Sequence, residues 1–195
     1  MWHSTLDPEL DGLQIRSGNT AVCLDFFCFT KGYPIGGASQ LRQTLGMQNF
    51  IVNAGGDLCL RGQHWRRPMA YRCNNGVLAS LDLRGSACVF TSGDYQRFFE
   101  FEGKRYYHIF DPRTGSLAQH TRSVSVTAND PALSDAAATA LFVAGPGDWK
   151  KIAMALGVEH VLLPDRSDTA YLTPYLAEKL SYVRRPNTVK VAPVN

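Results

Sequence analysis

The sequence lacks any long apolar run, and its longest apolar stretches fall far short of the roughly 20 residues that a membrane-spanning helix requires. It also lacks dense runs of Lys or Arg: Arg66-Arg67 and Arg184-Arg185 are isolated pairs, and the formal net charge is only +3. So mild a charge is not typical of a nucleic-acid-binding protein, which gathers basic residues on one face. We therefore expect neither a membrane-spanning helix nor a nucleic-acid partner.

Cysteine pairs at metal-binding spacing are missing too. The five cysteines, Cys23, Cys28, Cys59, Cys73 and Cys88, form no C-x-x-C pair, and no paired histidines follow them. This excludes the common zinc motifs. Because an odd number argues against a complete disulfide framework, we expect mostly free thiols, with one disulfide or one reactive thiol as the alternatives. Free thiols fit a reducing compartment at least as well as an oxidising one.

The familiar phosphate-binding loops are also absent. The segment NAGGD, Asn53 to Asp57, is neither a Walker A motif nor a G-x-G-x-x-G motif, and its glycines predict a tight turn after a strand. The first ten residues, MWHSTLDPEL, have no basic segment followed by an apolar one, so we expect no signal peptide in them. Nothing in the chain therefore fixes a compartment.

What is present favours a globular α+β fold. The 195 residues, 45% of them hydrophobic, suit one domain, 1–195, with a real core. Patterning predicts strands at 49–53, 77–83, 87–91, 123–128 and 158–163, and helices at 37–45, 130–143, 149–156 and 173–182. Because strands come in runs, with 77–83 and 87–91 as a hairpin, we expect a mixed or antiparallel sheet core flanked by helices. The tail, 184–195, is expected to be loose.

An alanine-rich helix carries the first candidate site. Asp130 and Pro131 are a typical helix start, and Asp135 and Thr139 follow at a spacing of four, which puts both on one helix face. Their oxygens are hard ligands that suit a divalent cation such as Mg²⁺, with carbonyls and waters completing the shell. The alternative is structural: an acid favoured in the first helical turn, and a threonine bonded to its own helix.

Two further pairs have the residue types of a reactive site. His108 ends a β-prone segment and can move a proton near neutral pH, while Asp111 begins the turn DPRTG; the alternative is a half-buried histidine and an acid that holds its own turn. Asp25 lies inside an apolar segment, and Lys31 follows it. This lysine offers charge to a phosphate, or simply forms an ion pair with Asp25.

Six motifs in a fixed order give the chain a recognisable likeness. They are D-x-x-x-x-x-KGY (25–33), NAGGD (53–57), TSGDY (91–95), HIFDPRTG (108–115), SVTA (125–128) and SDAAATALFVAG (134–145). This order resembles the ApbE family, the flavin transferases also called FAD:protein FMN transferases. The resemblance covers roughly Leu6 to Leu163 and implies an ApbE-like fold.

The resemblance also implies an activity. Members of this family cleave FAD and pass FMN to a Thr or Ser hydroxyl of an acceptor protein, releasing AMP with the help of Mg²⁺. It implies that Asp135 and Thr139 are metal ligands, joined by backbone carbonyls near Cys28 and at Ala138. By the same likeness, Asp25, Lys31 and Phe110 would contact FAD, and His108 would take the proton of the acceptor hydroxyl.

The chain departs from the family pattern at two points. Phe27 and Cys28 stand where the family usually has glycines, and the chain begins after an N-terminal portion that the family normally carries. We therefore keep two alternatives: an FAD pyrophosphatase, in which water replaces the acceptor, and a non-catalytic flavin-binding or partner-binding module. An unpaired sheet edge would favour a homo-oligomer. Family members are mostly periplasmic or anchored to the inner membrane.

Overall fold

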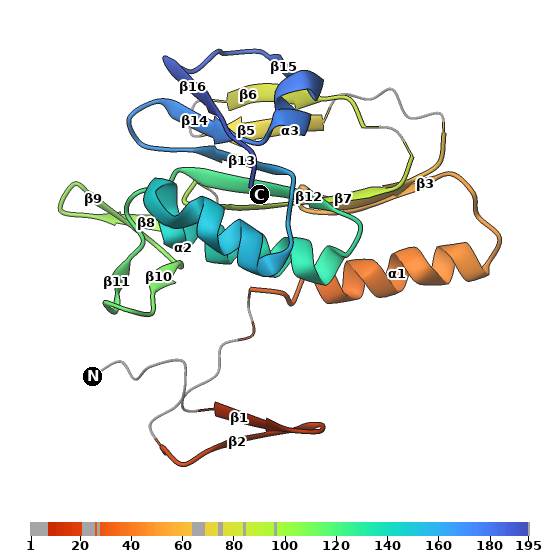
Figure 1. The fold of residues 1–195 in the computed structure, drawn as a ribbon, viewed down its shortest axis with the longest axis horizontal. Helices are drawn as coiled ribbons and strands as arrows, with labels where there is room; N and C mark the ends of the chain where they lie inside the picture. The colour runs from red at the N-terminus through yellow and green to blue at the C-terminus, as the bar shows by residue number, and fades with distance from the viewer. Residues whose placement is uncertain are drawn as a thin grey trace.

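The computed structural model describes residues 8–20, 26, 28–63, 69–73, 76–83, 85–95 and 97–194, and every structural statement below concerns these residues. A seven-stranded mixed sheet forms the centre, with the strand order β16-β14-β13-β12-β7-β4-β3 (Figure 1). Its strands are β3 (Phe50–Ala54), β4 (Asp57–Arg61), β7 (Ala87–Gly93), β12 (Ser123–Ala128), β13 (Val161–Pro164), β14 (Thr169–Leu172) and β16 (Thr188–Val191). Only the β14–β16 pair is parallel. The expected α+β class is confirmed.

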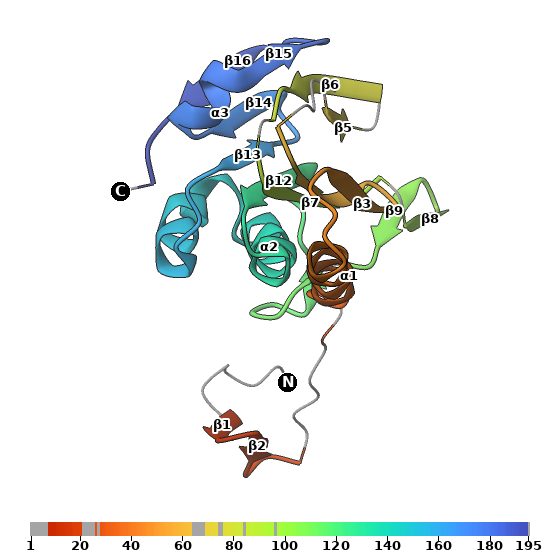
Figure 2. The same cartoon turned by 90° about the vertical axis from the view of Figure 1, so that its right-hand side faces the viewer.

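Helices cover one face of this sheet and a smaller sheet covers the other (Figures 1 and 2). The helices are α1 (Gly32–Thr44) and α2 (Pro131–Leu156), and the small sheet has the order β15-β6-β5. Its strands are β5 (Met69–Cys73), β6 (Gly76–Leu81) and β15 (Leu180–Tyr182), with the short helix α3 (Pro174–Lys179) beside them. Alternation along β12 explains the layering: Val124 and Val126 face α2, and Ser125 faces the other way.

Three hairpins lie outside these layers. They are formed by β1 (Pro8–Asp11) with β2 (Gln14–Ser17), β8 (Phe98–Phe101) with β9 (Lys104–Tyr107), and β10 (Phe110–Asp111) with β11 (Ser116–Leu117). The β1–β2 hairpin lies away from the sheet in both views (Figures 1 and 2). Among the described residues, no helix combines the length and the apolar character that crossing a bilayer requires.

The sequence signals at both ends of the Asp135 helix are confirmed. Asp130 is the N-cap, and its side chain accepts the backbone N–H groups of Ala132 and Leu133. The helix stops at Gly145, whose φ of 68° and ψ of −175° are not helical, and a second helical segment follows within α2. The sequence therefore predicted the helix and its stop correctly from local chemistry alone.

The structure corrects the predicted hairpin of 77–83 with 87–91. β6 pairs with β5 and β15, whereas β7 pairs with β4 and β12, so the two strands belong to different sheets. The turn at Gly85-Ser86 connects two layers rather than two neighbouring strands. Local patterning could not show this, because the true partners of both strands lie elsewhere in the chain.

Four other expectations differ from the structure. The helix predicted at 173–182 ends at Lys179, and Leu180–Tyr182 form β15. Helix α1 begins at Gly32 rather than 37, because its first N–H groups find an acceptor on α2. The tail from 184 includes β16, which pairs with β14, so it is not wholly loose. Cys59 and Cys88, directly opposite each other on β4 and β7, form a disulfide, in which Cys28 takes no part. The alternative of one disulfide therefore describes these two cysteines better than free thiols.

Candidate functional site

The carboxylate of Asp135 joins the two helices. Its Oδ2 accepts the backbone N–H of Gly32 at 2.7 Å and that of Lys31 at 3.2 Å, both at the start of α1. A helix start favours a negative charge because its first N–H groups have no partner within the helix. The side chain is only 6% exposed. Among the described residues, both hydrogen bonds to this carboxylate are accepted by Oδ2.

Close packing permits this contact. A Cβ on Gly32 would lie 2.3 Å from the carbonyl oxygen of Pro131, and one on Gly36 would lie 2.7 Å from the ring of the same proline. Both glycines are therefore needed for α1 to approach the start of α2 this closely. The KGY and SDAAATALFVAG motifs meet at this crossing.

Lys31 connects the start of α1 to the sheet. Its ammonium group forms an ion pair with Oδ2 of Asp57, whose side chain is only 4% exposed, while the side chain of Lys31 is 46% exposed. The other oxygen of Asp57, Oδ1, accepts the backbone N–H of Thr91 at 2.9 Å. The expected turn in NAGGD is confirmed, since Asn53 Oδ1 accepts the N–H of Gly56. Its last residue also serves the site, which sequence analysis missed.

Thr139 faces the sheet next to Asp135. Its Oγ1 lies 2.9 Å from Oγ of Ser92 on β7 and 3.5 Å from the backbone carbonyl of Asp135. Ser92 belongs to the TSGDY motif, so a fourth motif joins the cluster. The sequence alone does not point to Ser92, because the two hydroxyls are 47 residues apart in the chain.

The neighbours of Asp135 have opposing effects on the pKa of its carboxyl group. Burial raises the pKa of its carboxyl group above the ordinary value of 3.8, the N–H group of Gly32 lowers it, and the nearby charge of Asp57 raises it again. The net effect is a raised pKa. A buried carboxylate that disfavours its own charge gains from a cation. With the carboxylate of Asp135 and the adjacent hydroxyl of Thr139, the donor set fits a hard divalent cation.

The HIFDPRTG segment supports the far end of the Asp135 helix. Asp111 binds Arg113 through both carboxylate oxygens, the shortest contact being 2.8 Å, and this bond lowers the pKa of Asp111. Arg113 in turn donates to the carbonyl of Val143 at 3.4 Å, just before the helix breaks at Gly145. Asp111 also accepts the N–H of Arg113, so its turn-holding role is confirmed.

The remaining predicted residues stay predictions. His108 and Phe110 are exposed beside this turn, Phe110 by 52%, and among the described residues neither forms a hydrogen bond or ion pair with the Asp135 cluster. Cys28 lies in the turn before α1, and Ala138 is fully buried within α2. Asp25, like Phe27, lies outside the described residues, so its expected ion pair with Lys31 is untested.

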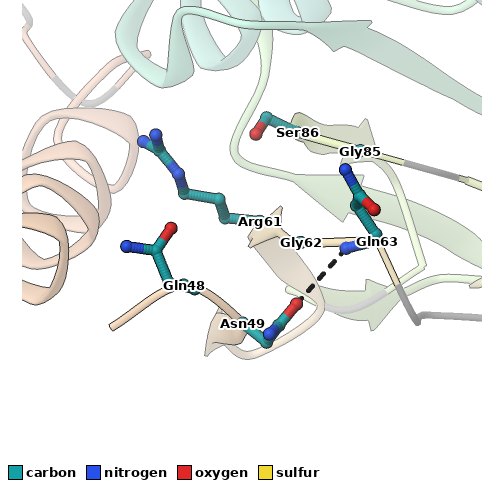
Figure 3. A pocket seen from close by; sticks show the side chains of 7 residues that line it. All are labelled: Gln48, Asn49, Arg61, Gly62, Gln63, Gly85 and Ser86. Atoms are coloured by element: carbon teal, nitrogen blue, oxygen red, sulfur yellow. Dashed lines mark hydrogen bonds between the residues drawn. The ribbon is translucent and has the colours of Figure 1, made fainter. Parts of the chain in front are cut away.

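A separate hollow lies at the end of β4 that is remote from Asp57 (Figure 3). It has a volume of about 380 Å³ and is lined by Gln48, Asn49, Arg61, Gly62, Gln63, Gly85 and Ser86. Asn49 Oδ1 accepts the backbone N–H of Gln63 at 3.2 Å across its floor. None of the predicted site residues lines it, so it is not the candidate site.

Comparison with known proteins decides the family. The family model described as the ApbE family matches residues 2–162. This chain belongs to the ApbE family. It is 38% identical over 181 residues to the FAD:protein FMN transferase of Rhodobacter capsulatus, and 30% identical over 154 residues to that of Escherichia coli K12. The alignments cover 91% and 75% of the chain.

Solved ApbE structures share the fold. The ApbE protein of Thermotoga maritima superimposes with a TM-score of 0.78 at 28% identity, covering 89% of this chain and 59% of that one. The flavinyl transferase ApbE of Pseudomonas stutzeri gives 0.69 at 27% identity, covering 85% and 52%. The matched part spans 35% of the length of the Rhodobacter relative and 44% of that of the Escherichia relative.

Proposed function

We propose that this chain carries the site of an Mg²⁺-dependent FAD:protein FMN transferase, which attaches FMN through a phosphoester to a Thr or Ser of an acceptor protein. The relatives named FAD:protein FMN transferase support the reaction class. The observation that carries the proposal for this chain is the meeting of Asp135 and Thr139 with Lys31 and Asp57 at the crossing of α1, α2 and the sheet.

In the proposed reaction, the oxygen of the acceptor hydroxyl bonds to the phosphorus of the FMN half of FAD. The bond from that phosphorus to the bridging oxygen breaks, and AMP leaves with that oxygen. A divalent cation bound by Asp135 and Thr139 would neutralise charge on the diphosphate. The side chain of Lys31 is half-exposed and forms an ion pair with the buried Asp57. It adds a positive charge at the crossing of α1 and α2.

The other predicted residues have roles in this proposal. His108 accepts the proton of the acceptor hydroxyl. Asp25, Lys31 and Phe110 would contact FAD. The backbone carbonyls of Cys28 and Ala138 would complete the protein ligands of the cation.

The test is an assay with FAD, Mg²⁺ and an acceptor protein that bears the target Thr. We expect fluorescent flavin on the acceptor band in a denaturing gel, at least a hundredfold less with Asp135→Ala, and none when Mg²⁺ is chelated. Asp148→Ala is the matched control, because Asp148 lies further along the same helix with its side chain 59% exposed. It should transfer flavin like the unmodified protein.

Other outcomes separate the alternatives. Release of FMN and AMP without an acceptor would identify FAD hydrolysis. FAD binding by calorimetry without any turnover would identify a binding module. Equal labelling by the protein and by Asp135→Ala would contradict the proposed metal site.

A further inference from the structure

The hydroxyl of Thr139 has a single proton and two possible acceptors for it. One is the carbonyl of Asp135, in the same helix, at 3.5 Å. The other is Oγ of Ser92, on β7, at 2.9 Å. At 3.5 Å the bond within the helix is at the limit of a hydrogen bond, so Ser92 is the better acceptor.

The direction of this proton decides what Thr139 offers to a ligand. A hydroxyl has one donor and two lone pairs, and it coordinates a cation only through a lone pair. When the proton is directed to Ser92, both lone pairs of Oγ1 remain available to a cation.

Ser92 is held in place for this task. The preceding residue, Thr91, donates its backbone N–H to the buried carboxylate of Asp57. Its hydroxyl lies 2.8 Å from that of Ser125 on the opposite face of the sheet. These bonds anchor β7 next to Ser92, whose hydroxyl lies on the α2 face beside that of Thr139.

We infer that Ser92 is a positioning residue that accepts the Thr139 proton and thereby directs a lone pair of Thr139 Oγ1 toward a divalent cation held with Asp135. Ser92 acts through Thr139. The inference rests on the proposed metal site, and it adds a residue from β7 to the predicted metal site.

The experiment measures cation binding rather than turnover. Mn²⁺ is titrated into protein with FAD, free Mn²⁺ is counted by electron paramagnetic resonance, and FAD without protein is the blank. We expect Ser92→Ala to weaken Mn²⁺ binding about tenfold, because partners of metal ligands typically contribute that much. Ser92→Thr keeps a hydroxyl and should stay within about threefold of the unmodified protein, by the same reasoning. Ser92→Cys has a weak acceptor and should behave like Ser92→Ala.

Ser125→Ala is the matched control. It removes one hydroxyl of the Thr91–Ser125 pair, which joins β7 to β12 on the face of the sheet away from α2. Its thermal stability should fall about as much as that of Ser92→Ala, while its Mn²⁺ affinity should not change. Unchanged Mn²⁺ affinity in Ser92→Ala and Ser92→Cys, or an equal loss in Ser125→Ala, would overturn the inference.

The outcome is separable from that of the proposed function. The expected order of Mn²⁺ affinities together with no flavin transfer by the unmodified protein would support the role of Ser92 and contradict the transferase activity. Flavin transfer that is lost in Asp135→Ala would support the transferase. If Ser92→Ala then binds Mn²⁺ as tightly as the unmodified protein, the inference is overturned.

Discussion

The carboxylate of Asp135 is buried beside a second carboxylate, that of Asp57, and both conditions raise its pKa. A raised pKa in the folded state means that folding favours the protonated form of this group. Its contribution to stability is therefore greatest below the ordinary pKa of 3.8 and is lost as the pH rises through the raised value. At neutral pH, a charged Asp135 reduces the stability of the apoprotein, as is common for groups kept for binding.

Replacing Asp135 by Asn tests whether the buried charge of Asp135 lowers the stability of the apoprotein. Without Mg²⁺ at pH 7, Asp135→Asn should unfold at a higher temperature than the unmodified protein, because it keeps an oxygen for Gly32 and has no charge to bury. The gain should shrink as the pH falls toward 4. Adding Mg²⁺ should raise the melting temperature of the unmodified protein alone. Differential scanning calorimetry at several pH values, with and without Mg²⁺, measures these melting temperatures. A stabilisation by Asp135→Asn that grows at low pH would contradict a raised pKa of Asp135.

At the scale of elements, the crossing of α1 over the start of α2 builds the site. The crossing depends on Gly32, since a side chain there would overlap the backbone of Pro131 and the Cβ of Asp135. Sequence analysis placed the start of α1 five residues too late, because the segment before Gly37 has no N-cap signal of its own. The acceptor that replaces the cap is Asp135, 103 residues further along the chain.

The substitution Gly32→Ala should separate the helices. We expect a loss of about 1–3 kcal/mol in the free energy of unfolding, as for overpacked cores, and weaker Mn²⁺ binding. Gly37→Ala is the matched control, since a Cβ at that position would have no atom within 4 Å and alanine favours helix. It should stabilise the protein by about 0.5–1 kcal/mol. Urea denaturation distinguishes the two, and equal effects would argue against close packing at Gly32.

At the scale of the whole molecule, the middle of the sheet is tied together beneath the site. The Cys59–Cys88 disulfide joins β4 to β7 and is packed against Ile35 of α1. Cys59 lies two residues after Asp57, and Cys88 lies three before Thr91, whose N–H Asp57 accepts. The covalent link therefore supports the strand pair that holds Lys31 and Ser92.

Reduction of this disulfide should lower the stability of the protein. A bridge that closes a loop of this size contributes about 3.6 kcal/mol in the chain-entropy model. We expect a lower urea midpoint in dithiothreitol, and a non-reduced digest in which the Cys59 and Cys88 peptides are linked. The Cys59→Ser/Cys88→Ser double variant is the control and should show no response to dithiothreitol. A midpoint that is unchanged by reduction in the unmodified protein would contradict a stabilising bridge.

Features whose partners lie within a few residues could be predicted from the amino-acid sequence. The helix start at Asp130, its stop at Gly145 and the turn held by Asp111 all follow from side chains bonding to their own backbone neighbourhood. The spacing of four between Asp135 and Thr139, which puts both on one helix face, is also a local feature of this kind. The order of the motifs was enough to indicate the family, because it is itself a property of the sequence.

Which motifs meet depends on the three-dimensional fold. Lys31 and Asp57 are 26 residues apart, Ser92 and Thr139 are 47 apart, and Cys59 and Cys88 are 29 apart. Nothing in local patterning selects one such partner over others, because these contacts depend on the order of strands in the sheet and on the crossing of two helices. The same reason explains why β6 and β7 were wrongly paired: their short connection favours a hairpin, and only packing against other strands separates them.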